Sequence, residues 1–278
     1  MKILLAPNPY RDSKLHCARR AEKILREMKV ETVLCPLFAE HFGGDVPTAE
    51  QLETTDLLLA FGGDGTFLHA AKWAASYGVP VLGINLGRTG FLAGLPGKKL
   101  SMLRRLVEGQ YHVEKHMMLQ AEVFRGNDHL DSMLALNDVI LSKSDLMSAV
   151  DLSVQINDTP MFRITGDGVI VATPTGSTAY SLSAGGPVME HTLQSIVVTP
   201  ICPHRLDART YALDPDRVVK VVVEPHSGTD VLLSIDGQKT QMLQGQDWVE
   251  VRRADQQALL VRLEGDDFYQ DLQNKLNL

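Results

Sequence analysis

The chain has 278 residues, of which 44% are apolar, and this length suits two packed domains of about 100 to 200 residues each. Its formal net charge is −7 and its basic residues are spread along the sequence, which argues against a nucleic-acid surface, because such surfaces cluster positive charge. No apolar run approaches the ~20 residues that span a bilayer, and the strand-like start, Met1 to Ala6, lacks the apolar core of a signal peptide, so we expect a soluble, cytoplasmic protein.

The first part of the chain alternates strand-like and helix-like segments. Apolar runs predict strands at Lys2 to Ala6, Thr32 to Cys35, Asp56 to Phe61 and Pro80 to Ile84. Helices are predicted around Leu15 to Met28, Thr66 to Ser76 and Lys98 to Glu108. Because this alternation indicates parallel strands with right-handed crossovers, we predict an α/β domain over residues 1–114.

The second part changes to short β-branched segments separated by turn residues. Strands are predicted at Leu119 to Phe124, Ala135 to Leu141, Val150 to Ile156, Val169 to Ala172, Ile196 to Thr199, Val218 to Val223 and Val231 to Ile235. We therefore predict a β-rich, sandwich-like domain of mostly antiparallel strands over residues 115–254, with the boundary near Glu114. The segment Gly176 to Ala184 is small and polar enough for a short helix or a turn at a ligand.

A glycine turn with one carboxylate follows the Asp56 to Phe61 strand. Gly62-Gly63-Asp64-Gly65-Thr66 stands between this strand and the next helix, and glycines without a Cβ let backbone amides approach a phosphate closely. Asp64 would then accept a proton or hold a metal, whereas in the plainer alternative it only caps the helix. No Gly-Lys-Ser/Thr follows, so the turn is not a nucleotide P-loop.

A second glycine loop, Gly83 to Phe91, follows the next strand. The carboxyl ends of the strands in an open α/β sheet line the ligand crevice, so we expect this loop to neighbour the Asp64 turn. Arg88 can meet a phosphate and Phe91 can stack on a base. Alternatively, Arg88 is solvated and Phe91 fills the core of the domain.

Two polar stretches stand out in the second half. Asn137-Asp138 lies in an apolar run, where an unpartnered polar pair is costly, so the pair belongs at a strand end, on a solvent face or on a ligand such as a ribose. Gly166-Asp167-Gly168 and Thr173 to Pro187 combine small residues with hydroxyl groups that can bind a polar ligand. A flexible linker has a similar composition, but the apolar residues before and within these stretches argue against disorder.

The remaining candidates carry weaker signals. Asp236-Gly237-Gln238 closes a strand and can be simply a hairpin turn. The histidines are expected on the surface, in the core or in support of binding groups, and His69 is counted among the candidate binding residues. No metal ligand is assigned and reduced thiols are expected, because paired metal or disulfide spacing is absent among His69, His116, His191, His204, Cys17, Cys35 and Cys202.

Taken together, these segments resemble the NAD kinase family, in order along most of the chain. The glycine turn alone is shared in similar form with diacylglycerol and sphingosine kinases and with phosphofructokinases. The Thr173 to Pro187 stretch is far more specific. Three further segments match with it: Asn85 to Phe91, Thr199 to His204, and Asp236 to Gln238.

The resemblance implies an N-terminal Rossmann-like α/β domain, a C-terminal β-rich domain, NAD held between them, and a C-terminal tail, about 255–278, that packs back on the first domain. The implied reaction transfers the γ-phosphoryl group of ATP, or in some members a polyphosphate group, to the 2′-hydroxyl of the adenosine ribose of NAD, giving NADP. Homodimers or homotetramers are implied, in which a neighbouring subunit can complete a site. We expect Mg²⁺ bound by ATP to neutralise the phosphates, since this acidic chain offers few local cations.

The resemblance also implies roles for individual residues. Asp64 is the base for the 2′-hydroxyl, Gly65 lies beside the phosphates and Phe91 is the aromatic on the adenine side. Asn137 faces adenine and ribose, and Asp138 faces a ribose. Further contacts are implied for Asp167, Thr178, Ala179, Tyr180, Ser183, Cys202 and Gln238, and the candidate set is completed by His69, Arg88 and Thr165.

Two positions depart from the family pattern. The acid after Asn137 is usually Glu, whereas Asp138 reaches about one methylene less, so its hydrogen bond runs through water or needs a loop shift. An Arg commonly stands two residues before Asp167, where this chain has Thr165, with Arg163 two residues earlier. Either Arg163 substitutes by a different loop path or that phosphate contact is lost.

Two other kinds of protein compete with this interpretation. A lipid kinase shares the glycine turn, but Thr178-Ala179-Tyr180 favours a dinucleotide. A non-catalytic module that senses NAD would keep the pocket without turnover, and Asp64 argues against it, because a pure binder has little use for an acid beside a phosphate.

Overall fold

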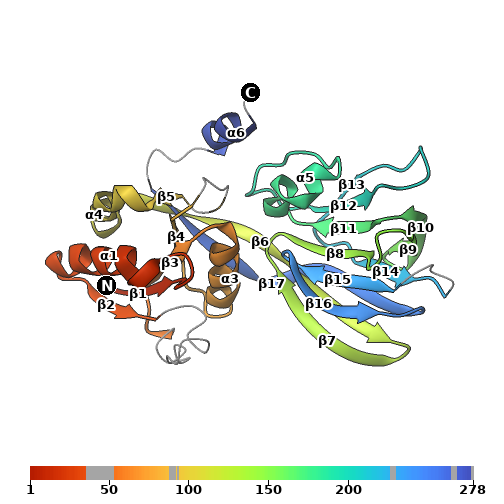
Figure 1. Ribbon diagram of the computed structural model, residues 1–278, viewed down its shortest axis with the longest axis horizontal. Coiled ribbons are helices and arrows are strands. Elements are labelled where there is room, and N and C mark those ends of the chain that lie inside the picture. The colour runs from red at the N-terminus through yellow and green to blue at the C-terminus, as the bar shows by residue number, and fades with distance from the viewer. Residues whose placement is uncertain (36–52, 88–91, 93, 226–229, 264–267, 277–278) are drawn as a thin grey trace. The chain divides into compact units, whose positions relative to one another are not determined.

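The computed structural model describes residues 1–278 apart from 36–52, 88–91, 93, 226–229, 264–267 and 277–278. The chain divides into two compact units (Figure 1). Unit 1 is Met1–Lys115 with Gln257–Leu278, and unit 2 is His116–Gln256. The long strands β6 (Tyr111–Arg125) and β17 (Asp247–Leu263) each contribute residues to both units. No helix among the described residues is both long enough and apolar enough to cross a membrane.

Unit 1 is a parallel sheet with helices. Its strands pair in the order β4, β3, β1, β2, with β5 and the end of β17 added beside β4, and every pair is parallel. Helices α1 and α3 flank these strands (Figure 1). The elements are β1 (Lys2–Pro7), η1 (Ser13–Leu15), α1 (His16–Glu27), β2 (Glu31–Leu34), β3 (Leu57–Gly62), α3 (Asp64–Ala75), β4 (Val81–Asn85), β5 (Leu95–Pro96), η3 (Gly97–Met102), α4 (Leu103–Val107) and α6 (Phe268–Leu276).

Strand β3 shows why this sheet is covered on both faces. All six of its residues are buried, which is the near-continuous apolar pattern of a parallel strand between helices. Leu57, Leu59 and Phe61 pack in one cluster with residues of α1 and α4, whereas Leu58 and Ala60 alternate to the opposite face. The α/β class predicted for this part of the chain is confirmed.

One predicted helix of unit 1 was wrong in detail. Lys98 to Glu108 is not a single α-helix but the 3₁₀ segment η3 followed by the short helix α4. The backbone of Lys99, which lies within η3, takes non-helical angles, with φ −103° and ψ 29°, so the first part of the segment is kinked.

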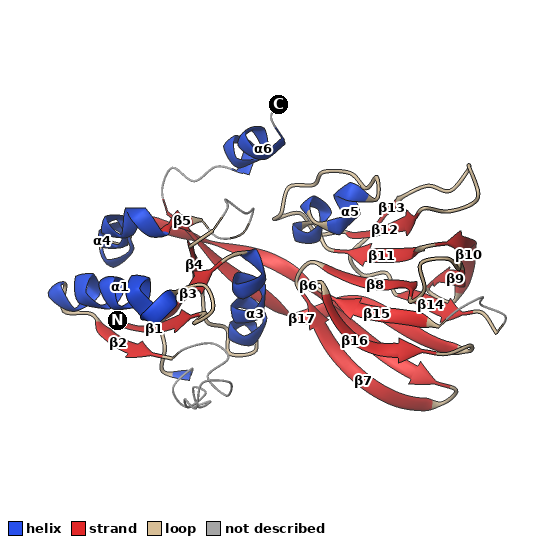
Figure 2. Ribbon diagram, in the orientation of Figure 1, coloured by secondary structure: helices blue, strands red, loops and turns tan. Residues whose placement is uncertain are grey.

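Unit 2 consists almost entirely of strands, with α5 and a short 3₁₀ turn as its helical elements in the described residues (Figure 2). One sheet has the order β13, β12, β11, β8, β15, β16, and the other places β10, β9, β14 and β17 in a row, with β6 and β7 paired beyond. The elements not yet given are β7 (Asp128–Ala135), β8 (Asp138–Lys143), β9 (Val150–Ile156), β10 (Thr159–Gly166), β11 (Gly168–Ala172), η4 (Thr175–Thr178), α5 (Tyr180–Ser183), β12 (Ile196–Ile201), β13 (Tyr211–Leu213), β14 (Val219–Val223), β15 (Val231–Ile235) and β16 (Gln238–Leu243).

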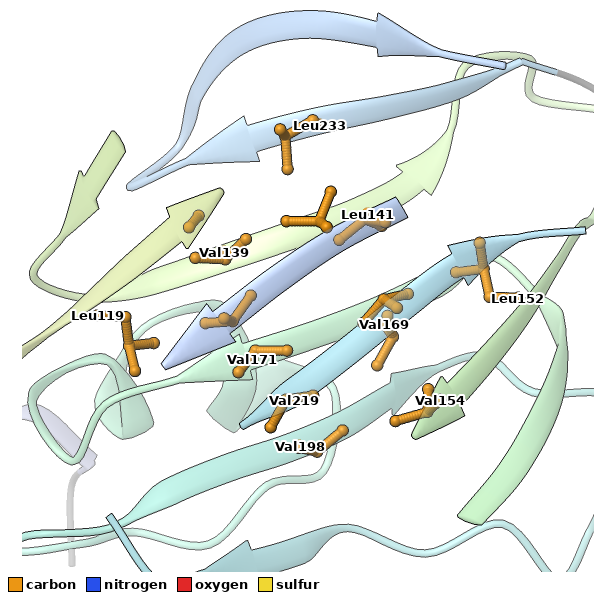
Figure 3. Packing of buried hydrophobic residues seen from close by; sticks show 14 of the residues in the cluster. Leu119, Val139, Leu141, Leu152, Val154, Val169, Val171, Val198, Val219 and Leu233 are labelled. Atoms are coloured by element: carbon orange, nitrogen blue, oxygen red, sulfur yellow. The ribbon is translucent and has the colours of Figure 1, made fainter. Parts of the chain in front are cut away.

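The two sheets of unit 2 share one apolar core. Val139, Leu141, Val169 and Val171 from one sheet lie in the same cluster as residues of β6, β9 and β14 from the other (Figure 3). Alternate residues of β14 and β15 are buried, as a strand with one face on a core requires. The predicted β-rich, mostly antiparallel class is confirmed.

The prediction of one continuous strand over Ala135 to Leu141 was wrong. The chain instead bends at Leu136 and Asn137, so that β7 ends at Ala135 and β8 begins at Asp138. Apolar content hid this bend, because Leu136 and Val139 on either side of the polar pair are both buried. The bend places the polar pair at a strand end, one of the three locations predicted for it.

Candidate functional site

The glycine turn of unit 1 joins a buried strand to a helix. Strand β3 ends at Gly62 and α3 begins at Asp64, with Gly63 as the N-cap residue in extended conformation. The alternative in which Asp64 caps the helix is therefore wrong, since Asp64 is the first helical residue. Its carboxylate is half-buried at the end of the helix where the backbone dipole favours negative charge.

Close packing fixes the path of this turn. A Cβ on Gly62 would stand 2.3 Å from Thr66 Oγ1, so only glycine fits there. Asn8 Nδ2 donates to the same Thr66 hydroxyl over 2.9 Å. By contrast, a Cβ on Gly63 or Gly65 would meet nothing within 4 Å. The turn is thus rigid on its inner side and open on its outer side, which is the arrangement that lets a phosphate approach backbone amides.

His69 lies one helical turn beyond Gly65, on the same face of α3. Its ring is half-buried, and burial, with a smaller effect of Lys72, lowers the pKa of His69 from its ordinary value of 6.5. The imidazole is therefore neutral at neutral pH and can donate or accept a hydrogen bond. Across the described residues, no three His, Cys, Asp or Glu groups come together as a metal site.

The loop after β4 lies beside the glycine turn, as the strand order predicts. Leu86 N donates to Gly62 O over 2.9 Å, and Asn85 is only 8% exposed, with its Oδ1 accepting from Gly87 N over 2.8 Å. A pocket of about 530 Å³ opens here, lined by residues that include Asn85, Gly87, Arg20 and Lys98. The candidates Arg88 and Phe91 lie outside the described residues.

In unit 2 the Asn137-Asp138 pair forms a buried corner between β7 and β8. Asn137 is 9% exposed and Asp138 is 3% exposed. Asn137 Oδ1 is a buried acceptor without a hydrogen-bond partner among the described residues. A buried carbonyl of this kind costs free energy unless a donor reaches it, so this atom indicates a ligand with an N–H or O–H group.

The small polar stretch after β11 folds as two short helices, η4 and α5, which confirms the prediction of a short helix. Thr173 starts the stretch, and its Oγ1 accepts from Gly176 N over 3.0 Å. Gly176 packs so tightly on the corner that a Cβ would lie 2.1 Å from Asn137 O. Thr178 and Ala179 are half-buried, while Ser183 is exposed and Tyr180 is 45% exposed, which leaves both side chains available to a ligand.

Two buried histidines brace η4, and sequence reasoning did not assign them this role. His116 Nδ1 lies 2.8 Å from Thr175 Oγ1, and His191 Nε2 lies 3.2 Å from Thr178 Oγ1. The two rings are 5.9 Å apart between centroids, and His116 is fully buried. The sequence indicated only that neither histidine has the spacing of a metal ligand, and it gave no sign of the contacts with η4.

The other unit 2 candidates divide between the two ends of β11. Gln238 follows the turn beside the corner, where Asp236 N donates to Asp138 O over 3.0 Å. Thr165, Asp167 and Cys202 lie at the opposite end, where Asp167 N donates to Ile201 O and Asp167 pairs with Lys143 Nζ at 2.7 Å. Five strand residues separate the two ends by about 16 Å at ~3.3 Å per residue, so one chain does not gather all the candidates in one place.

A parallel α/β unit with an open glycine turn, and a β-sandwich unit with a buried polar corner, together define a nucleotide phosphotransferase. The comparisons with known proteins specify which kind. The model of the ATP-NAD kinase N-terminal domain matches residues 3–111, and that of the ATP-NAD kinase C-terminal domain matches residues 136–263. The chain therefore belongs to the NAD kinase family, as the sequence resemblance predicted.

Individual relatives agree with this assignment. An NAD kinase of Acetivibrio thermocellus is 35% identical over 280 residues, covering 99% of this chain and 97% of the relative. An NAD kinase of Symbiobacterium thermophilum is 48% identical over 223 residues, covering 80% and 78%.

Two solved structures share the fold. The NAD kinase from Archaeoglobus fulgidus in complex with ATP matches with a TM-score of 0.76 at 25% identity, covering 100% of this chain and 98% of that one. Yeast NADH kinase complexed with NADH matches with a TM-score of 0.86, covering 100% and 88%, and at 24% identity this likeness concerns the fold alone.

Proposed function

We propose that the chain is an NAD kinase, which transfers the γ-phosphoryl group of ATP, or a phosphoryl group of polyphosphate, to the 2′-hydroxyl of the adenosine ribose of NAD and releases NADP. The observation that carries this proposal is the turn at Asp64. It combines one half-buried carboxylate at a helix N-terminus with two glycines whose outer sides are open. Such a turn suits a reaction in which phosphates and a proton acceptor must meet.

Asp64 is the base in this proposal. As the γ-phosphorus forms a bond to the ribose 2′-oxygen, its bond to the bridging oxygen of ADP breaks, and Asp64 accepts the proton of the hydroxyl. Phosphoryl transfer depends mainly on alignment and on stabilisation of charge, which the amides near Gly65 supply. ATP is the substrate as its Mg²⁺ complex in this proposal, because Mg²⁺ prefers hard oxygen ligands such as those of the phosphates.

The acceptor NAD is bound by unit 2 residues in this proposal. Asn137 Oδ1, buried and without a partner in the described chain, accepts from the adenosine moiety. Asp138, Thr178, Ala179, Tyr180, Ser183 and Gln238 supply further contacts. Thr165 replaces the usual arginine of the family, and Arg163 lines the same pocket of about 240 Å³, so Arg163 supplies the missing phosphate contact.

The residues at the far end of β11 act in the site of a second copy of the chain. Asp167, with Thr165 and Cys202, is separated from Asn137 by the length of the strand, and a homodimer or homotetramer overcomes this separation. Exposed apolar side chains on nearby loops support association: Leu146 is 87% exposed, Met147 92% and Leu206 98%. Light scattering after size-exclusion chromatography tests this, and a monomer that turns over at the full rate refutes it.

We also propose a cytoplasmic location. The cytoplasm holds the substrates NAD and ATP and keeps thiols reduced, which suits the three free cysteines, Cys17, Cys35 and Cys202. Fractionation of cells that express a tagged chain tests this, and recovery from an envelope or secreted fraction contradicts it.

The activity is tested by incubating the pure protein with NAD, ATP and Mg²⁺ and measuring NADP. We expect Asp64→Asn to lower turnover at least about a hundredfold, while the Kd for NAD stays within about twofold, because the variant removes a base but keeps the shape. Asp255→Asn, which removes one exposed acid, is the matched control. Near wild-type activity of the Asp64→Asn variant contradicts the role of Asp64 as the base. If the wild-type protein phosphorylates diacylglycerol or sphingosine instead of NAD, it is a lipid kinase. If it binds NAD without turnover, it is a sensing module.

A further inference from the structure

Two residues hold every backbone polar group of the Leu136–Asp138 corner. Each of the three corner residues has one N–H and one C=O group, and all six groups are hydrogen-bonded to either Asp236 or Thr173. Buried backbone groups normally find partners in a regular ladder, and at this bend they cannot. The corner is therefore fixed by residues that lie far away in the sequence.

Asp236 holds four of the six groups. Its carboxylate accepts from Leu136 N over 3.1 Å, from Asn137 N over 2.7 Å and from Asp138 N over 3.2 Å. Its own backbone N donates to Asp138 O over 3.0 Å. A carboxylate that accepts several backbone N–H groups makes charge-assisted hydrogen bonds, which are stronger than those of a neutral acceptor.

Thr173 holds the remaining two carbonyl groups from the other side. Its hydroxyl donates to Leu136 O over 2.6 Å, and its backbone N donates to Asn137 O over 2.9 Å. Gly176 then packs directly on Asn137 O. Asn137 is thus confined from both sides, while its side-chain carbonyl stays without a partner in the described chain.

The choice of Asp at position 236 exceeds what its hairpin turn requires. Asp236 and Gly237 have φ values of 51° and 76°, the pattern of a tight turn that accepts Asn-Gly as readily as Asp-Gly. In an Asp236→Asn variant, one carboxylate oxygen would become an NH₂ group facing backbone N–H donors. The turn explains the glycine, but only the corner explains the carboxylate.

We infer that Asp236 is a positioning residue for NAD recognition, which acts by fixing the backbone of the corner from which Asn137 meets the adenosine moiety. This inference rests on the proposed function for the identity of the ligand. Asp236 acts on ground-state binding, so its loss raises the KM and Kd for NAD and leaves kcat nearly unchanged.

A double-mutant cycle tests the inference. We expect Asp236→Asn to raise the Kd and KM for NAD about tenfold, which is the effect of ~1.4 kcal/mol, with kcat within about twofold of wild type. In an Asn137→Ala background the same change should alter Kd by less than about twofold, because Asp236 acts through Asn137. An equal effect in both backgrounds, or a fall in kcat at unchanged Kd, overturns the inference.

A second pair of variants covers a failure of Asp236→Asn to fold. Thr173→Val removes the hydroxyl and should weaken NAD binding in the same way, whereas Thr173→Ser keeps the hydroxyl and should bind like wild type. Equal affinities of the Thr173→Val and Thr173→Ser proteins overturn the inference.

Amide hydrogen exchange separates this inference from the proposed function, because it needs no substrate. Amides of residues 136–138 should be protected in wild type and should exchange at least about tenfold faster in Asp236→Asn, or in Thr173→Val if the first variant does not fold, with β12 unchanged. Unchanged exchange overturns the inference even if the enzyme makes NADP. If the variant exchanges faster but the wild-type protein makes no NADP, the proposed function is refuted, while the role of Asp236 in holding the corner is still supported.

Discussion

Gly176 is the position where the smallest change in side chain should disturb the site most. A Cβ added there would stand 2.1 Å from Asn137 O, 2.5 Å from Asn137 C and 2.8 Å from Asn137 Cα, whereas ordinary contact begins at 3.4 Å. All three atoms belong to the backbone, so no side chain can swing aside. The corner cannot yield cheaply either, because Asp236 and Thr173 hold it from two sides.

The magnitude of the effect follows from this geometry. Overpacking a fixed core typically costs about 1–3 kcal/mol, and a backbone contact places Gly176→Ala at the upper end of that range. For a domain of this size, we expect unit 2 to melt roughly 5 °C or more below wild type. Displacement of Asn137 should also weaken NAD binding at least about tenfold, since the orphaned acceptor no longer meets its donor.

Scanning calorimetry and titration with NAD measure the two effects in the same samples. Gly65→Ala is the matched control for stability, because an added Cβ there meets nothing within 4 Å. A Gly176→Ala protein that melts within about 1 °C of wild type and binds NAD normally would refute the reasoning, since the backbone of the corner would then move aside at little cost in free energy.

Two further predictions follow from the structure. Gly65→Ala should stabilise unit 1 slightly, by about 0.5 kcal/mol, yet lower turnover at least about tenfold by placing a methyl group where phosphates approach; wild-type kinetics would contradict the phosphate site. Arg125→Met should lower the melting temperature of unit 2 near neutral pH, because it removes the ion-pair partner of Asp247. Burial opposes the ionisation of Asp247, but hydrogen bonds from Arg125 at 2.8 and 2.9 Å and from the amide of Gln244 outweigh this effect and lower the pKa of Asp247 from 3.8. A carboxyl group whose pKa is lower in the folded than in the unfolded protein stabilises the fold at pH values above its unfolded pKa, and this stability is lost as the pH falls through its folded pKa. The difference in melting temperature between wild type and Arg125→Met should therefore shrink in acid. A constant difference from about pH 7 to about pH 3 would contradict the ion pair.

The sequence predicted the elements whose cause is local. Strands such as Val231–Ile235 have the predicted bounds, because β-branched runs between turn residues need no distant information. The long strand β17 was not predicted, since its middle reads Arg-Arg-Ala-Asp-Gln-Gln. Its strand conformation depends on pairing with β6, and with β14 and β4 nearer its ends. The local sequence of a strand does not reveal which distant strands pair with it.

The candidate site shows the same division between local and distant causes. The glycine turn at Asp64 could be read from the sequence, because a strand, three glycines and a helix follow each other directly. The roles of Asp236 and Thr173 could not, since the groups they hold are 98 to 100 residues away from Asp236 and 36 to 37 residues away from Thr173. An Asp-Gly pair predicts a hairpin turn, and that prediction is confirmed, but it says nothing about what the carboxylate accepts.

Several residues proposed to touch NAD differ in burial from residues that hold the site in shape, although the proposed contact Asp138 is buried and the positioning residue Asp236 is half-buried. Tyr180, Ser183 and Gln238 are exposed, whereas Thr173 and His116 are fully buried and engage other protein groups. A ligand contact must be reachable, while a residue that fixes backbone geometry works best where water cannot compete for its hydrogen bonds. Asn137 differs from both sets, since its backbone is completely engaged while its buried side-chain carbonyl is without a partner in the described chain. The specificity of the pocket should therefore depend as strongly on the buried frame as on the exposed contacts.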